Sequence, residues 1–430
     1  MIKKRELKIN IQTIFLAVLV FCGLLTIYLP SISTPIGELY PYRILLPSYF
    51  VFLVFFLKRK LKGRHAQFTI LCFLSLVLYG LISAIWAVSP MAVLQSVMNY
   101  AMSLLLIATI CIVCKNKPKM EKLVVILWVA LVFLAFLGIV ESSVNRFLVF
   151  TGDRPEWNLT FFGTIRPLLF FHNENDYTLL LMLFLPLFIA YASKRGFVAR
   201  TCAFLTTILF VFVNILTTAR TTFILIPLYF YLWLFFTKKI RLFLVLTLII
   251  VIVGAIFAGD IISYLGLGYG NADNNARVAI WLNGLRSFRQ THGFGVGAGN
   301  SSIPIPGVEY IGVMSVPHFW FLEVLIEFGV VIFTIIMLWY LVTIYRLVKI
   351  KNKDPYRVAF VITMILMPMW SMLPGSIAPT PFVWFFFAMA TAYTNILIQQ
   401  RQVGLFQVFV LANVSTKIVE PNTCIGISKK

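Results

Sequence analysis

Charge is scarce in this chain, and negative charge is scarcer still. Of 430 residues, only 12% are charged, with 15 Asp and Glu against 36 Lys and Arg, while 60% are hydrophobic. Soluble domains usually carry about a quarter charged residues. This composition therefore excludes a soluble globular protein and leaves a protein embedded in a membrane.

Several catalytic signatures are missing as well. The sequence has no Asp-x-Asp pair for a metal-bound nucleotide sugar, no His-Glu-x-x-His zinc helix, no Gly-x-Ser-x-Gly elbow and no P-loop. Glycine alternates with other residues over 293–299, but no strand pattern precedes this run and no Lys-Ser/Thr follows it, so a nucleotide site is not expected. We expect the run to let backbone approach a ligand or a helix end. The chemistry that is left is a reaction with no metal site and no cofactor.

Apolar sequence, by contrast, is present in long runs. A helix needs roughly 20 apolar residues to cross a membrane, and twelve runs approach that length. We predict an all-α integral membrane protein of about twelve transmembrane helices, with the membrane domain over 1–399 and a cytoplasmic tail over 400–430. The runs lie near 11–29, 40–57, 67–88, 91–114, 122–141, 176–193, 198–217, 221–236, 240–258, 317–345, 357–374 and 379–399.

The cations indicate which helix ends face the cytoplasm. Counted on alternate sides of the predicted helices, 28 Lys and Arg fall on one side and eight on the other. The side richer in these residues is normally cytoplasmic, so we place both termini inside the cell. Because the cations lie in short patches between apolar runs, they do not form a basic groove for nucleic acid.

All eight cations on the predicted outer side are arginines, although topology alone would accept lysine equally well. A guanidinium binds phosphate oxygens through a planar fork and keeps its charge. We therefore expect a phosphorylated ligand outside, and pairing with acidic residues is the alternative for individual members of the set. The eight are Arg43, Arg146, Arg154, Arg166, Arg220, Arg277, Arg286 and Arg289.

Two predicted outer loops are long enough to carry chemistry, one near 142–175 and a large extracytoplasmic loop near 259–316, before the tenth helix. Between the seventh and eighth helices, a short turn places Arg220 at the outer membrane boundary. A charge there is costly unless it is paired or bound to a ligand, although snorkelling to lipid headgroups is also open.

The entrance to the tenth helix contains a histidine and two carboxylates. His318 follows a proline and is either a packed residue or a base, with neither interpretation favoured. Glu323 and Glu327 are four residues apart and share a helix face. Carboxylates within a membrane are functional candidates, and a buried structural acid is the equal alternative.

Four segments together resemble the O-antigen polymerase and O-antigen ligase superfamily. They are Phe171-His-Asn-Glu-Asn175, the turn around Arg220, Asn274-Asn-Ala-Arg277-Val-Ala-Ile-Trp281, and the stretch from the glycine run through His318 to Gly329. The resemblance covers about 165–345 by motif and the rest only by helix count.

The resemblance implies a glycosyltransferase of the bacterial cytoplasmic membrane. Such an enzyme takes a glycan from an undecaprenyl-diphosphate carrier on the outer leaflet and transfers it to an acceptor hydroxyl. The departing diphosphate would be stabilised by arginines, and His318 or, failing it, Glu323 would act as general base. His172 departs from the family pattern and receives no role. The predicted catalytic residues are Arg220, Arg277, His318 and Glu323, and the predicted substrate-binding residues are Arg166, Asn175, Trp281, Arg286 and Arg289.

Three activities remain open at this point. We favour a polymerase that joins repeat units of a capsule, exopolysaccharide or O-antigen. A ligase would transfer the glycan to lipid A core or another acceptor, and a flippase would only move the lipid-linked oligosaccharide. The expected partners are undecaprenyl-diphosphate-linked oligosaccharide, a glycan acceptor and the lipid bilayer, with a flippase and a chain-length regulator as further candidates.

Overall fold

Helices make up most of the chain that the structure, a computed structural model, describes: residues 11–25, 32–34, 37–148, 160, 162–169, 171, 173–256, 272–312, 314–350 and 354–418. Between the first two helices, a short antiparallel hairpin pairs β1 (Ile32–Thr34) with β2 (Gly37–Leu39). The second helix continues into a π-helical turn, η1 (Phe52–Phe56). The helices are α1 (Ile11–Leu24), α2 (Pro41–Val51), α3 (Arg64–Ser83), α4 (Pro90–Val113), α5 (Lys117–Ser143), α6 (Glu174–Ser193), α7 (Phe197–Thr217), α8 (Arg220–Phe236), α9 (Ile240–Ile256), α11 (Ala272–Gln290), α12 (Trp320–Lys349), α13 (Pro355–Trp370) and α14 (Pro381–Ile418).

Each of the twelve apolar runs overlaps one of these helices. Among the described residues, seven helices are long and apolar enough to cross a membrane, and four apolar helices are shorter. The prediction of an all-α membrane protein is confirmed, while twelve crossings remain a prediction. Two of the predicted segments contain helix: α11 occupies much of the predicted 259–316 loop, and α14 continues to Ile418, through most of the predicted tail.

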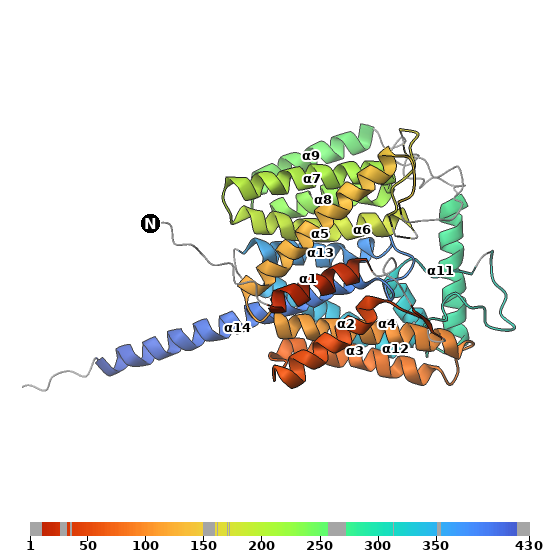
Figure 1. The fold of residues 1–430 in the computed structure, drawn as a ribbon, viewed down its shortest axis with the longest axis horizontal. Helices are drawn as coiled ribbons and strands as arrows, with labels where there is room; N and C mark the ends of the chain where they lie inside the picture. The colour runs from red at the N-terminus through yellow and green to blue at the C-terminus, as the bar shows by residue number, and fades with distance from the viewer. Residues whose placement is uncertain are drawn as a thin grey trace, which may run out of the picture.

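The long helices run side by side as a bundle (Figure 1). α11 lies across one end of this bundle, roughly at right angles to the other helices, and the late turns of α14 project beyond the opposite end. α11 and the end of α14 thus lie at opposite ends of the bundle, as the topology expected from the charges requires.

The core of the bundle is built on α6 and the first part of α14. In their membrane-crossing windows, 78% of residues are buried in α6 and 89% in 381–400, against 28% in α7. Trp384 of α14 lies edge-on to Phe73, Tyr100 and Trp320, with ring centroids 5.4, 5.8 and 5.9 Å away. α6 and the first part of α14 therefore form the centre, and α7 lies at the periphery of the bundle.

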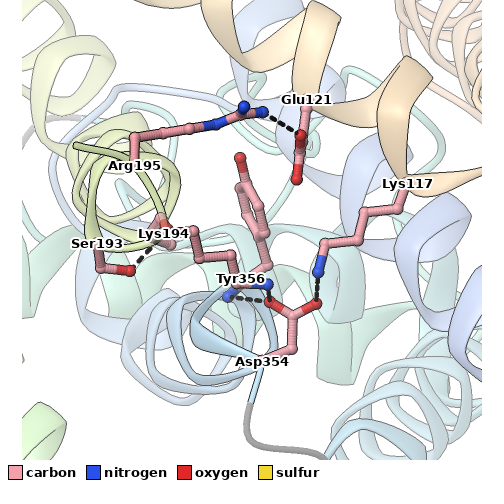
Figure 2. Close-up of polar contacts among 8 residues, drawn as sticks. Lys117, Glu121, Ser193, Lys194, Arg195, Asp354 and Tyr356 are labelled. Carbon is pink, nitrogen blue, oxygen red and sulfur yellow. Dashed lines mark hydrogen bonds and ion pairs between the residues drawn. The ribbon is translucent and has the colours of Figure 1, made fainter. Parts of the chain in front are cut away.

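A polar cluster ties together the ends of α5, α6 and α13 (Figure 2). The Asp354 carboxylate, which precedes α13 and is 5% exposed, forms ion pairs with Lys117 and Lys194. Beside it, Arg195 pairs with Glu121 at 2.8 Å. Burial alone would raise the pKa of the Asp354 carboxyl, but hydrogen bonds from the two lysines hold this pKa below its ordinary value. All three cations belong to the set that the sequence assigns to the cytoplasmic side.

α12 is broken at Gly329, which has φ 74° and ψ 178°. Its two arms fold back on each other, because the rings of Phe321 and Tyr340 lie 5.1 Å apart. In a straight helix these residues would be about 28 Å apart, at about 1.5 Å per residue. The break leaves carbonyl groups around 326–327 without the helical donors that would normally satisfy them.

The glycine run fills this break. Val296 and Gly297 donate their backbone N–H groups to the carbonyls of Ile326 and Glu327, at 2.9 and 3.0 Å. A Cβ on Gly295 would lie 2.5 Å from the Glu327 carbonyl oxygen, so only glycine fits there. The expectation that this run lets backbone approach a helix end is confirmed.

The carboxylate of Glu327 also serves this loop. It accepts hydrogen bonds from the Gly299 backbone N–H at 2.8 Å and from the Ser301 hydroxyl at 2.7 Å. On the other side of the loop, the side chains of Tyr79 and Trp86 donate to the carbonyls of residues 294 and 295. Glu327 therefore has a structural role, and the loop is fixed between α3 and α12.

Candidate functional site

Three residues expected in the site meet where α11 crosses the bundle. Arg277 and Trp281 are one turn apart on α11, and His318 lies two residues before α12. The Trp281 indole donates a hydrogen bond to the Pro317 carbonyl at 2.6 Å, and its ring lies 6.4 Å from that of Phe319. α11 is thereby held over the segment that contains His318.

His318 is held in a strained and electropositive setting. Its φ is +49°, a left-handed conformation that few residues other than glycine adopt. Burial and then the charge of Arg277 lower the pKa of its imidazole below 6.5, against a smaller opposing effect of a hydrogen bond to the Pro374 backbone. Its Nδ1 is buried and has no hydrogen-bond partner among the described residues. The imidazole is therefore neutral near pH 7 and can accept a proton.

Glu323 binds the segment around Gly375 and Ser376, which lies close to His318. The Ser376 hydroxyl donates to one oxygen of the buried Glu323 carboxylate, and the other oxygen has no partner among the described residues. Gly375, the neighbour of Ser376, lies close to His318, since a Cβ on Gly375 would be 3.8 Å from His318 Cε1. The structure thus brings Glu323 and His318 close to two neighbouring residues of one short segment.

Arg166 and Asn175 lie at the start of α6. Arg166 forms an ion pair with Glu174 at 3.3 Å, and both side chains are about a quarter exposed. The Asn173 side chain caps the helix by accepting from the Asn175 backbone N–H at 2.9 Å. Arg166 is therefore one of the outer arginines that pair with an acidic residue, which was the alternative to binding a phosphorylated ligand.

The turn that contains Arg220 lies beside the same end of α6. The hydroxyls of Thr178 and Thr217 share a hydrogen bond of 2.9 Å, which places the α7–α8 turn against the first turns of α6. Arg220 is the first residue of α8, but its side chain lies outside the described residues, as does all of His172.

Arg286 and Arg289 make no described contact with the group formed by Arg277, Trp281 and His318. Both are exposed on α11, and Arg286 donates to the Glu309 backbone carbonyl at 3.1 Å. Within the described part of the chain, no hydrogen bond or ion pair links either arginine to His318.

Sequence reasoning missed a cavity next to His318 that is lined by Arg43, Asn99 and Asp176. Arg43 donates to the Asn99 carboxamide at 2.7 Å across 56 residues of sequence. No motif joins these positions, and only the packing of α2, α4 and α6 reveals the group.

Comparison with known proteins agrees with the resemblance seen in the sequence. The family model described as O-antigen ligase matches residues 205–337, from α7 to the second arm of α12, a stretch that includes Arg220, Arg277 and His318. The teichuronic acid biosynthesis protein TuaE of Bacillus subtilis (strain 168) is 24% identical over 447 residues, covering 91% of this chain and 86% of that protein. No solved structure matches the chain. The similarity to the O-antigen ligase and polymerase superfamily is thereby confirmed.

Proposed function

From this similarity, we propose that the protein is a membrane glycosyltransferase that transfers a glycan from an undecaprenyl-diphosphate carrier to an acceptor hydroxyl. The reaction takes place at the outer face of the bacterial cytoplasmic membrane, with both termini inside. The observation that carries the proposal is the meeting of Arg277, Trp281 and His318 at one end of the bundle, inside the stretch that matches the O-antigen ligase family.

Arginine supplies the charge that the departing diphosphate needs. As the bond to the anomeric carbon breaks, negative charge grows on the leaving oxygen, so guanidinium groups fixed nearby stabilise the transition state more than the bound substrate. Arg277 is exposed, and within the described part of the chain no acid pairs with it. Arg220 is the second member of this role, and Trp281 stacks against a sugar face.

His318 takes the proton of the acceptor hydroxyl. A base has to be unprotonated at the working pH. The lowered pKa of His318 meets this condition, and its Nδ1, which is buried and has no partner among the described residues, is the ring nitrogen that would accept the proton. Glu323, five residues further along the chain, is the next candidate for the base.

An apolar groove beside the site suits the isoprenoid chain of the carrier. It has a volume of about 340 Å³ and lies between the two arms of α12 and Pro368 of α13. It begins at Phe319, next to His318, and its lining is entirely apolar. A lipid chain lying there would leave its diphosphate close to α11.

A polymerase remains the favoured activity, and a ligase is the second candidate. The description of the matching family as O-antigen ligase favours the ligase. The name of the relative, a teichuronic acid biosynthesis protein, favours a role in making a cell-envelope polysaccharide and is compatible with either. In both activities the donor is the same lipid-linked glycan and only the acceptor differs.

A strain that lacks the gene distinguishes these activities. A missing polymerase should leave lipid-linked single repeat units on the outer leaflet, and a missing ligase should leave lipid-linked long chains there. Single units accumulating on the inner leaflet would identify a flippase and contradict the proposal. The wild-type gene should restore the polymer in this strain. A gene with Arg146→Lys should restore it too, because Arg146 is an exposed residue of the predicted outer set, just after the end of α5.

A further inference from the structure

A cavity of about 330 Å³ reaches Gly375, at which a Cβ would lie 3.8 Å from His318 Cε1. Its walls come from the end of α1, the start of α2, the middle of α4, the start of α6 and the segment 375–384. Gly375, the neighbour of His318, and Ser376, which donates its hydroxyl hydrogen to the Glu323 carboxylate, both line it. Arg277 and Trp281 do not line it, so the cavity is distinct from the place assigned to the diphosphate.

The polar groups of this cavity include both donors and acceptors. The Arg43 guanidinium donates to Asn99 and lies 5.6 Å from the Tyr40 ring centroid. Ser103 and Thr380 present hydroxyls, which donate to carbonyls of the chain near them. A hydroxylated ligand needs such a mixture, because each hydroxyl both donates and accepts.

Asp176 is the group that the protein itself leaves unsatisfied. It lines the cavity from the first turn of α6, and its Oδ1 is buried without a hydrogen-bond partner among the described residues. A buried carboxylate oxygen without a donor is costly. A ligand hydroxyl in the cavity would supply the missing donor.

Aromatic side chains form the apolar part of the wall. Tyr42, Phe171, Phe382 and Trp384 line the cavity, and the rings of Phe171 and Phe382 are held edge to face at 5.9 Å. Sugars combine a hydroxylated edge with apolar C–H faces, so a cavity with aromatic walls and a few placed polar groups matches them in shape and chemistry.

We propose that this cavity is the acceptor subsite and that Asp176 and Arg43 bind the hydroxyls of the acceptor sugar. The inference rests on the proposed function, because it takes His318 as the base toward which the acceptor hydroxyl points. A diphosphate has only acceptor oxygens and would leave Oδ1 of Asp176 without a donor, which argues against the donor's charged group as the occupant. Asp176 and Arg43 are thus specificity-determining residues for the acceptor.

Binding measurements test this assignment without turnover. The full chain is purified into lipid nanodiscs in an His318→Ala background, and two probes are used. One is a labelled oligosaccharide released by mild acid from the strain's own lipid-linked repeat units, and the other is sugar-free undecaprenyl diphosphate. We expect Asp176→Asn to raise the Kd of the oligosaccharide about tenfold or more, as for the loss of a hydrogen bond to a charged group, and to leave that of undecaprenyl diphosphate within about twofold.

Two further variants separate binding from folding. Ser103→Leu fills the cavity without touching Asp176 and should weaken oligosaccharide binding likewise, while Glu309→Gln, an exposed carboxyl outside the cavity, should not. A change in Kd is counted only for variants whose thermal unfolding midpoint equals that of the parent protein, so that it reports binding and not folding.

Oligosaccharide binding that both cavity variants leave unchanged would overturn the inference. Weakened binding of undecaprenyl diphosphate by Asp176→Asn would also overturn it, because the cavity would then belong to the donor. The proposed function fails separately if the wild-type protein binds the oligosaccharide in an Asp176-dependent way yet transfers no glycan.

Discussion

At the scale of the residue, His318 determines how the reaction depends on pH. Burial and Arg277 lower the pKa of its imidazole, so the neutral, base-competent form persists below the ordinary pKa of 6.5. Activity should fall only as pH drops through this lowered pKa, which places the acid limb of the kcat/KM profile below pH 6.5. Measuring kcat/KM between pH 5 and 8 checks the position of that limb.

His318→Ala should lower kcat by about 10² to 10⁴-fold and flatten the acid limb. The donor KM should change little, because deprotonation belongs to the transition state and not to carrier recognition. A fully active His318→Ala enzyme would move the base to Glu323 and leave the transfer reaction itself in place.

Some of the site could be predicted from residue patterns, and some could not. Arg277 and Trp281 share a face because they are four residues apart, and the proline before His318 marks a helix entrance, so both signals are local. Asp176 gave no such signal, although it stands next to Asn175, because the other residues that line its cavity come mostly from α2, α4 and the segment after α13. Contacts between helices that are far apart in the sequence produce no recognisable spacing of residues.

At the scale of the element, the break in α12 shapes the site. Gly329 has φ 74°, and a Cβ there would lie 2.4 Å from the Gly293 carbonyl oxygen and 2.5 Å from that of Phe294. Gly329→Ala should therefore push the glycine run out of the break, move the first arm of α12 and abolish most activity. We expect a loss of stability on the order of 3 kcal/mol, from the clash and the strained backbone together, seen as a lower thermal unfolding midpoint.

Gly163→Ala is the matched control, because Gly163 has the same φ of 74° but no described atom lies within 4 Å of its Cβ position. It should cost only the backbone strain, about 1 to 2 kcal/mol, and leave activity intact. Equal effects of the two substitutions would show that the contact between the glycine run and α12 does not fix the site.

The helices themselves were predictable where length and apolarity coincide, as in α3 to α7. α11 could not be predicted in this way, because Arg277, Arg286 and Arg289 interrupt its apolar residues. The helix lies across the end of the bundle, and hydropathy marks only helices that cross the membrane. The break at Gly329 was also hidden, since a single glycine in an apolar run looks the same in a straight helix and a folded one.

At the scale of the whole molecule, the distribution of cations predicts the orientation. The Lys117–Asp354–Lys194 cluster should face the cytoplasm and α11 the outside. In a cysteine-free background, a cysteine in place of the exposed Glu309 should react with a membrane-impermeant thiol reagent in intact cells, and one in place of Lys60 only after lysis. The reverse pattern would overturn the orientation and the proposed function with it.

The central claim is that arginine, and no metal ion, stabilises the departing diphosphate. The most direct test is glycan transfer by the purified protein from labelled lipid-linked repeat units in excess chelator. Wild type and Arg146→Lys should be fully active, while Arg277→Lys and Arg220→Lys, which keep the charge but lose the planar fork, should be slower by about 10² to 10³-fold with normal insertion. Near-normal transfer by both lysine variants, or activity that chelation abolishes and a divalent ion restores, would contradict the account.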